Sequence, residues 1–139
     1  MLMLAMHYRI IIKQGVDMAH TTSWYLPGKV ILHRVTGNMT ADDLEDMNRT
    51  TMENKPSSGR FLHQLIDISE MTKAPSIGTL RQHSRASGAD DGYIVIVGKI
   101  NRMIEFTITS IAQVTNFRML VAPTVEDAIR QLRNLDPSL

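Results

Sequence analysis

The chain has 139 residues, which suits a single domain and leaves no room for a second of ordinary size. Its 15 basic and 14 acidic residues nearly cancel and are mixed along the sequence, so nothing favours binding to nucleic acid or to an anionic membrane. Cysteine is absent, which excludes disulfides and cysteine-ligated zinc and favours a cytoplasmic location.

Residues 1–17 are apolar but too short to be a membrane anchor. The run from Met1 to Ile12 is interrupted by His7 and Arg9, lacks the basic start of a signal peptide, and is shorter than the about 18 residues that a spanning helix needs. From Met18 onward the sequence has the pattern of a self-contained domain. We therefore predict a leader or disordered tail at 1–17, one domain at 18–139, and no integral membrane segment.

The domain is expected to open with a β-hairpin. Two β-rich runs, Ser23–Leu26 and Val30–Thr36, flank a Pro-Gly-Lys turn at 27–29. Gly37 and Asn38 are expected to end the second strand, and Thr40 is expected to cap a helix. The inner face of that helix is predicted to carry Leu44, Met47, Thr51 and Met52.

Three further strands then alternate with three further helices. Strands are predicted at Phe61–Ile68, Tyr93–Val97 and Phe117–Val121, and the second of these is apolar throughout, as a strand buried on both faces should be. Helices are predicted at about 76–86, at 101–115 with a broad apolar stripe, and after Thr124. The stripe of the final helix consists of Val125, Ala128, Ile129, Leu132 and Leu135.

This order predicts an α/β fold with a single, mostly parallel sheet of about five strands, four helices and an N-terminal hairpin. Strands that alternate with helices need crossover connections, and these make neighbouring strands parallel. The Tyr93–Val97 strand is expected to lie between two parallel neighbours.

A segment after the Phe61–Ile68 strand resembles a family motif. Asp67-Ile68-Ser69 and Met71, followed by a short helix, together with the element order over 24–135, resemble the STAS domain, specifically its stand-alone SpoIIAA-like bacterial branch. The resemblance implies a protein-binding regulator related to anti-sigma-factor antagonists, in which a partner kinase phosphorylates a serine at the start of that helix. Counted without a gap from Asp67, the acceptor position falls on Ala74, which has no hydroxyl.

The segment Asp67–Leu80 is interpreted as a hydroxyl-rich turn at the carboxyl end of a parallel strand. Ser69, Thr72 and Ser76 are its candidate phosphoacceptors or regulatory residues. The simpler interpretation is that Ser76 caps a helix and that Asp67 and Ser69 accept backbone N–H groups of the turn.

A second candidate site follows the Tyr93–Val97 strand. If a ligand binds, the side chains of Asn38, Asp67, Ser69, Lys99 and Arg102 are expected to converge on one rim, where the two basic residues favour an anion. The alternative is that residues 98–102 form a turn followed by a helix N-cap at Asn101.

No catalytic or cofactor motif is recognisable in the sequence. The five histidines lack metal-ligand spacing, and His33 and His63, which lie inside predicted strands, are expected to be packed or solvent-facing rather than catalytic. Neither a Gly-x-Ser-x-Gly motif nor a phosphate loop with the required glycine spacing is present. We predict no enzyme activity, no metal and no cofactor.

The sequence thus favours a non-enzymatic regulatory or protein-interaction module with an unknown protein partner, expected to form a homodimer. The alternative function is a carrier or sensor of a small molecule or lipid, which would use the apolar face of the helix at 101–115.

Overall fold

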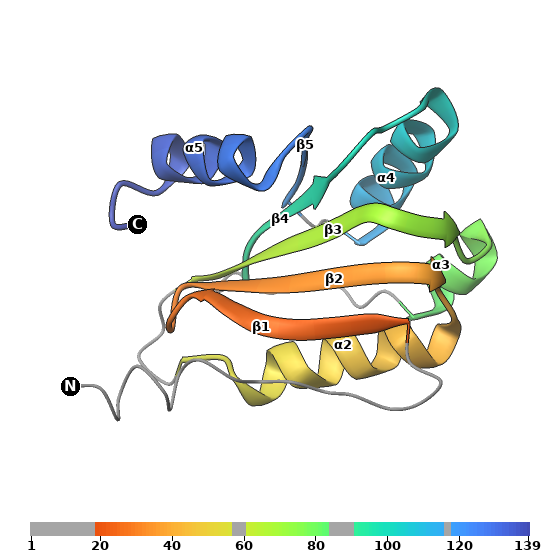
Figure 1. Cartoon of the computed structure of the whole chain (residues 1–139), viewed down its shortest axis with the longest axis horizontal. Coiled ribbons are helices and arrows are strands. Elements are labelled where there is room, and N and C mark those ends of the chain that lie inside the picture. Colours follow the sequence, from red (N-terminus) through yellow and green to blue (C-terminus); the bar gives the residue numbers. More distant parts are fainter. Residues whose placement is uncertain (1–18, 57–60, 84–90, 116–117) are drawn as a thin grey trace.

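Figure 1 shows the computed structural model, which describes residues 19–56, 61–83, 91–115 and 118–139. The predicted leader at 1–17 lies outside these residues and stays a prediction. The elements are β1 (His20–Leu26), β2 (Val30–Asn38), α2 (Ala41–Glu53), β3 (Leu62–Lys73), α3 (Ile77–His83), β4 (Asp91–Val97), α4 (Arg102–Thr115), β5 (Arg118–Ala122) and α5 (Val125–Leu135).

The five strands lie in the order β1-β2-β3-β4-β5. β1 is antiparallel to β2, whereas β2, β3, β4 and β5 are mutually parallel. Helix α2 connects β2 to β3, α3 connects β3 to β4, and α4 connects β4 to β5, as the alternation in the sequence requires. The predicted mixed sheet with an N-terminal hairpin is confirmed, and β4 lies between two parallel neighbours as expected.

The hairpin turn forms as predicted, but the second strand continues further. Gly28 has a φ of 73°, and the Lys29 N–H donates to the Leu26 carbonyl at 2.9 Å. The expected strand break at residues 37–38 is wrong, because β2 continues through Gly37 and Asn38. Gly37 has a φ of 65°, and a register shift against β3 follows it, so the strand accommodates the glycine as a local irregularity.

Helix α2 begins at the predicted cap and buries an unexpectedly polar face. The Thr40 hydroxyl accepts from the Asp43 N–H while the Asp43 carboxylate accepts from the Thr40 N–H, which is a capping box. Met52 is 60% exposed, so its predicted place on the inner face is wrong. The residues that α2 buries are Asp43, Asp46, Met47, Thr50 and Thr51.

Helix α5 packs an apolar stripe against the opposite face of the sheet, and α2 and α5 lie on opposite sides in Figure 1. Thr124 caps α5 as predicted. The prediction for Leu135 is wrong, since this side chain in the last turn is 48% exposed. The buried cluster under α5 comprises Val30, Leu32, Leu65, Val95, Val97, Ala122, Ala128, Ile129 and Leu132.

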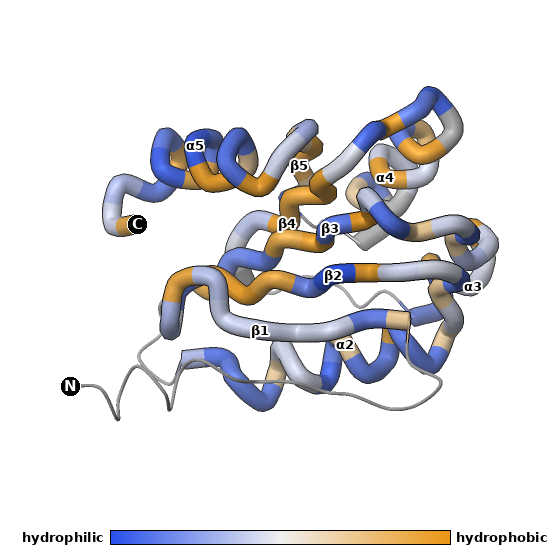
Figure 2. Tube along the Cα trace, in the orientation of Figure 1, coloured by the Kyte–Doolittle hydropathy of each residue, from blue (hydrophilic) through white to orange (hydrophobic). Residues whose placement is uncertain are grey.

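A smaller cluster of Val35, Met39 and Met47 lies on the α2 side. Figure 2 shows the resulting difference: β4, β5 and the inner side of α5 are hydrophobic, whereas α2 is largely hydrophilic. None of the helices in the described segments combines the length and apolar character needed to cross a bilayer.

Candidate functional site

The segment expected to form a hydroxyl-rich turn is mostly strand. β3 continues to Lys73, so only residues 74–76 connect it to α3, and the prediction of a turn from residue 67 onward is wrong. β2 is also longer than expected, and pairing with it keeps residues 67–73 extended: Arg34 aligns with Asp67, Thr36 with Glu70 and Asn38 with Lys73.

A β-bulge lies at the start of this extension. Arg34 and Thr36 are two positions apart in β2, but their β3 partners, Asp67 and Glu70, are three positions apart, so β3 contains one extra residue. The Asp67 carboxylate holds the bulge by accepting from the Ser69 N–H at 2.9 Å and from the Ser69 hydroxyl at 2.5 Å. These are the backbone contacts that the simpler interpretation of the sequence assigned to Asp67.

Beside the bulge lies an open hollow of about 120 Å³, lined by Arg34, Val35, Asp67, Ser69 and Glu70. An Arg34 guanidinium nitrogen lies 3.8 Å from the Asp67 carboxylate. The hollow is well below the about 300 Å³ of a typical small-molecule pocket, so it suits one side chain of a partner better than a whole ligand. Sequence reasoning missed Arg34 and Glu70, although Arg34 is a charged residue in the middle of a predicted strand.

The three candidate phosphoacceptors are all exposed. Ser69 donates its hydroxyl to Asp67, and Thr72 lies near the end of β3. The Ser76 hydroxyl accepts from the Thr79 N–H at 3.1 Å, which is the cap interaction predicted for it. A kinase could therefore reach each hydroxyl, and their roles as acceptors stay predictions.

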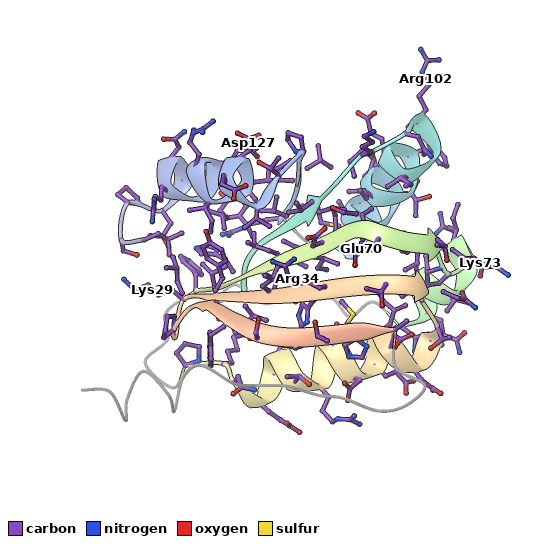
Figure 3. All side chains as sticks on the ribbon, viewed as in Figure 1. Lys29, Arg34, Glu70, Lys73, Arg102 and Asp127 are labelled. Atoms are coloured by element: carbon purple, nitrogen blue, oxygen red, sulfur yellow. The ribbon has the colours of Figure 1, made fainter. Side chains whose placement is uncertain are left out.

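The candidate ligand rim is dispersed. Asp67 and Ser69 adjoin each other, but Asn38 lies at the level of Lys73, six residues further along β3. Arg102 points away from the sheet at the start of α4 in Figure 3. Lys99 is exposed beyond the end of β4, where Asn101 caps α4 by accepting from the Ile104 N–H. The structure thus brings together only the Asp67–Ser69 part of the predicted rim.

The segment from Ile66 to His83, which we call the β3–α3 arm, is ordered but contains no fully buried residue. Along β4, by contrast, Ile94, Val95, Ile96 and Val97 are each at most 8% exposed. An arm that contributes so little to the core is positioned by strand pairing, capping and contacts of α3 with α2 and α4. Its side chains are therefore available to a partner.

A buried ionic network ties β1 to α2. The two ring nitrogens of His20 lie 2.8 Å from an Asp43 oxygen and 2.9 Å from an Asp46 oxygen, and all three side chains are at most 3% exposed. Ionised carboxylates only accept hydrogen bonds, so both ring nitrogens carry protons and His20 is an imidazolium. Burial raises the pKa of Asp43, but hydrogen bonds from Thr40, His20 and Ala19 outweigh it and hold the pKa below its usual value.

The pKa of Asp46 is lowered in the same way. Burial raises its pKa, and hydrogen bonds from Arg49 and His20 with their positive charges bring it below the ordinary value. No local sequence pattern indicates this network, because His20 lies more than twenty residues before its partners.

His33, fully buried in β2, belongs to a neutral network. Its ring nitrogens lie 2.8 Å from the Thr22 hydroxyl and 3.1 Å from the Thr51 hydroxyl. Because the Thr51 hydroxyl donates to the Met47 carbonyl, it must accept from His33. The pKa of His33 is lowered to about 4, mainly by burial and also by the charge of His20, while a hydrogen bond to Gln64 and the charge of Asp46 act in the opposite direction.

His63, in β3, is also fully used. Its Nδ1 accepts from the Tyr93 N–H at 3.0 Å and its Nε2 donates to Asp136 at 2.8 Å. Gly92 lies so close that an added Cβ would be 2.5 Å from Nδ1. Hydrogen bonds from Ser138 and His63 lower the pKa of Asp136 to about 2. Of the two alternatives expected for His33 and His63, packed or solvent-facing, their burial shows the packed one.

These contacts limit what the histidines can do. Each buried imidazole in the described segments has both nitrogens in hydrogen bonds within the fold, so none offers a free lone pair to a substrate or metal. In the same segments no cluster of three or more His, Asp or Glu side chains is arranged to hold a metal ion.

The apolar stripe of α4 is less buried than core packing would make it. Ile104, Ile108 and Ala112 are half-buried, and Phe106 is 64% exposed. α4 contacts α3 and β5, whereas α5 contacts β3, β4 and β5. The helix therefore leaves apolar surface at the side of the molecule away from α5.

Comparisons with known proteins support the fold. An uncharacterised protein of the DUF3478 family from Shewanella loihica PV-4, described as having a SpoIIAA-like fold, matches with a TM-score of 0.56. The match covers 87% of this chain and 98% of that chain at 16% identity. This chain has a SpoIIAA-like fold. No protein-family model matches the sequence, and no curated protein matches it significantly.

Proposed function

We propose that this SpoIIAA-like chain is a non-enzymatic, cytoplasmic regulatory module of STAS type that binds a protein partner through the β3–α3 arm. The observation that carries the proposal is that no residue of the arm, from Ile66 to His83, is fully buried, in an otherwise well-packed sheet. Residues that are ordered yet contribute little to the core are available for recognition. No cofactor is needed for this function.

The polar chemistry of the molecule supports binding rather than catalysis. The buried imidazoles of the described segments are occupied by internal hydrogen bonds. The hollow at Arg34 and Asp67 is open and holds about 120 Å³, so it cannot enclose a substrate away from water. Polar, solvent-accessible residues of this kind are found at the rim of protein interfaces.

Phosphorylation of the arm is the finer form of the proposal. A phosphate on Ser69 would place about two negative charges beside Asp67, break the hydroxyl contact and disturb the bulge. A phosphate on Ser76 would change the cap of α3, and one on Thr72 would alter the surface of β3. Each would change the shape or charge presented to a partner.

Crosslinking would test the binding surface directly. A photo-crosslinking amino acid is introduced at Thr72 in the arm and, as a matched control, at Arg133 on the exposed side of α5. We expect a partner to be captured from Thr72 and not from Arg133, and then to bind the purified wild-type protein. Capture from Arg133 alone would contradict the assignment to the arm.

The phosphoacceptor prediction is tested in an extract of the source cells with labelled ATP. Peptide mass spectrometry should find phosphate on Ser69, Thr72 or Ser76, and alanine at the modified position should abolish it. Unmodified peptides covering all three residues would remove the switch while leaving the binding module in place.

The exposed stripe of α4 supports a second candidate function, a carrier or sensor of an apolar small molecule or lipid. Ile104 and Ile108 provide apolar surface that the fold leaves partly uncovered. Native mass spectrometry of the purified protein would detect a co-purifying lipid. Light scattering tests the proposed homodimer: a doubled mass that Ile108→Glu reduces would assign the same stripe to self-association instead.

A further inference from the structure

Strand β3 extends well beyond its neighbour β4. The pairing of these strands ends where Asp67 aligns with Val97, whereas β3 continues to Lys73 along β2 alone. Gly98, with a φ of 135°, turns the chain away next to Ser69. In Figure 1 the arrow of β3 extends beyond that of β4 toward α3. Residues 70–73 therefore have one paired and one free edge within the described part of the chain.

The free edge offers backbone hydrogen-bonding groups. The Lys73 carbonyl points toward β2, because it accepts from the Met39 N–H at 3.0 Å. The register passes from Met71 to Lys73, so Thr72 has no aligned partner in β2. Along the other side of residues 70–73 no strand of the described segments is paired, because the ladder with β4 ends at Asp67. Another extended backbone can pair with the N–H and C=O groups of such an edge.

The surroundings of this edge are open and charged. Glu70, Thr72 and Lys73 are exposed, and Glu70 forms no ion pair in the part of the chain that the structure describes. Glu70 also lines the hollow next to Asp67. The outer edge of β5 differs, since Gln131 of α5 donates its amide to the Val121 carbonyl and so occupies one of its acceptors.

We propose that residues 70–73 of β3 accept an extended segment of a partner protein as an added strand, with a Lys or Arg side chain opposite Glu70. Main-chain hydrogen bonds supply affinity in this mode of recognition, and side-chain pairs supply specificity. The basic side chain complements Glu70 and lies beside the hollow, whose three charged residues sum to −1. The inference rests on the proposed function and specifies how the partner is held.

Fluorescence anisotropy with two labelled hexapeptides tests the mode of binding. One has the sequence Thr-Val-Lys-Val-Thr-Val and the other has Glu in place of Lys. We expect the Lys peptide to bind about fivefold more tightly, from the size of a cross-strand charge pair. The variant Glu70→Lys should reverse the preference. Two further peptides are N-methylated, one at its odd-numbered and one at its even-numbered residues. Binding should be lost in the peptide whose methylated N–H groups face β3 and kept in the other.

Two variants at one position separate the backbone from the side chain. Thr72→Pro places a residue that cannot pair within the edge segment 70–73 and should abolish peptide binding, whereas Thr72→Ala keeps the backbone and should bind as the wild type does. Circular dichroism checks the fold of both, and the N-methylated peptides give the same answer if Thr72→Pro does not fold.

The outcomes distinguish this inference from the proposed function. If neither peptide binds while the partner captured from position 72 still binds, strand addition is wrong and the interaction module stands. Equal binding of both N-methylated peptides would also overturn strand addition. A dimer that Thr72→Pro disrupts would assign the edge to a second copy of the chain and overturn the heterologous partner.

Discussion

The two faces of the sheet are filled by different chemistry. Under α5 the contacts are apolar, with Leu65, Val95 and Leu132 at 0% exposure. Under α2 the equally buried positions include His20, His33, Asp43 and the hydroxyl of Thr22. The apolar face is stabilised by how completely its side chains fill the space under α5, so its contribution to stability should vary little with pH. The polar face depends on matched donors and acceptors, so both a lost acceptor and an added proton should weaken it.

The largest effect is expected from Asp43→Ala. Asp43 accepts from His20, from the Ala19 N–H and from Thr40, so its loss leaves a buried imidazolium and several donors without an acceptor. We expect the free energy of unfolding to fall by about 4 kcal/mol in urea denaturation. Asp42→Ala is the matched control, because this exposed neighbour contributes only to the helix dipole, at about 0.5 kcal/mol. Equal losses would contradict the polar account.

On the apolar face, Leu132→Ala should destabilise the protein by about 3 kcal/mol, because it removes a fully buried side chain and leaves a cavity. The control is Leu135→Ala, one turn further along α5, where the side chain is 48% exposed and the cost should stay below about 1 kcal/mol. Urea midpoints at pH 7 and pH 5 should show the same difference between Leu132→Ala and the wild type.

The pH dependence of stability should separate the faces. At pH 5 His33 is neutral in the folded protein, where its pKa is about 4, but protonated in the unfolded chain, where it is 6.5. The unfolded state binds more protons, so acidification favours it, and the wild type should lose about 2 kcal/mol from this residue between pH 7 and pH 5. His33→Gln should remove that part of the slope in parallel urea titrations. An unchanged slope would exclude His33 as its source.

The smallest effect is expected from Met52→Gln. The side chain is 60% exposed at the end of α2, so the change in unfolding free energy should lie within about 0.5 kcal/mol. Thermal unfolding monitored by circular dichroism measures it. A large loss would place Met52 on the inner face of α2, as the sequence pattern suggested.

The predictable parts of the fold are those with strong local signals. The apolar run of β4, the glycine turn at 28 and the caps Thr40, Ser76, Asn101 and Thr124 each depend on neighbouring residues, and all are found in the structure. The element order then suffices for the sheet topology. Ends of helices were less predictable: Leu135 matches the periodicity of α5 but is only half covered.

The remaining features depend on partners distant in sequence. Asp, Ser and Glu disfavour strands, yet residues 67–73 are extended because β2 pairs with them up to Asn38. In the sequence, Asp43 and Asp46 resemble ordinary helix-start and surface residues. Only the structure shows that the His20 ring lies between their carboxylates. The predicted rim assumed that the strands end at one level, but β2 continues beyond Arg34, the partner of Asp67, and Asn38 therefore lies opposite Lys73.

Gly92 affects the hydrogen bonding of the His63 ring, which is distant in sequence but adjacent in space. A methyl group there would collide with the Nδ1 atom of His63, so alanine at this position would rotate or expel the imidazole and release both the Tyr93 amide and Asp136. The hydrogen bonds to Tyr93 and Asp136 set the tautomer of His63, and the missing carbon atom at Gly92 leaves the ring room to form both. Nitrogen chemical shifts of that ring would show whether a single glycine sets the orientation of a histidine that belongs to another strand.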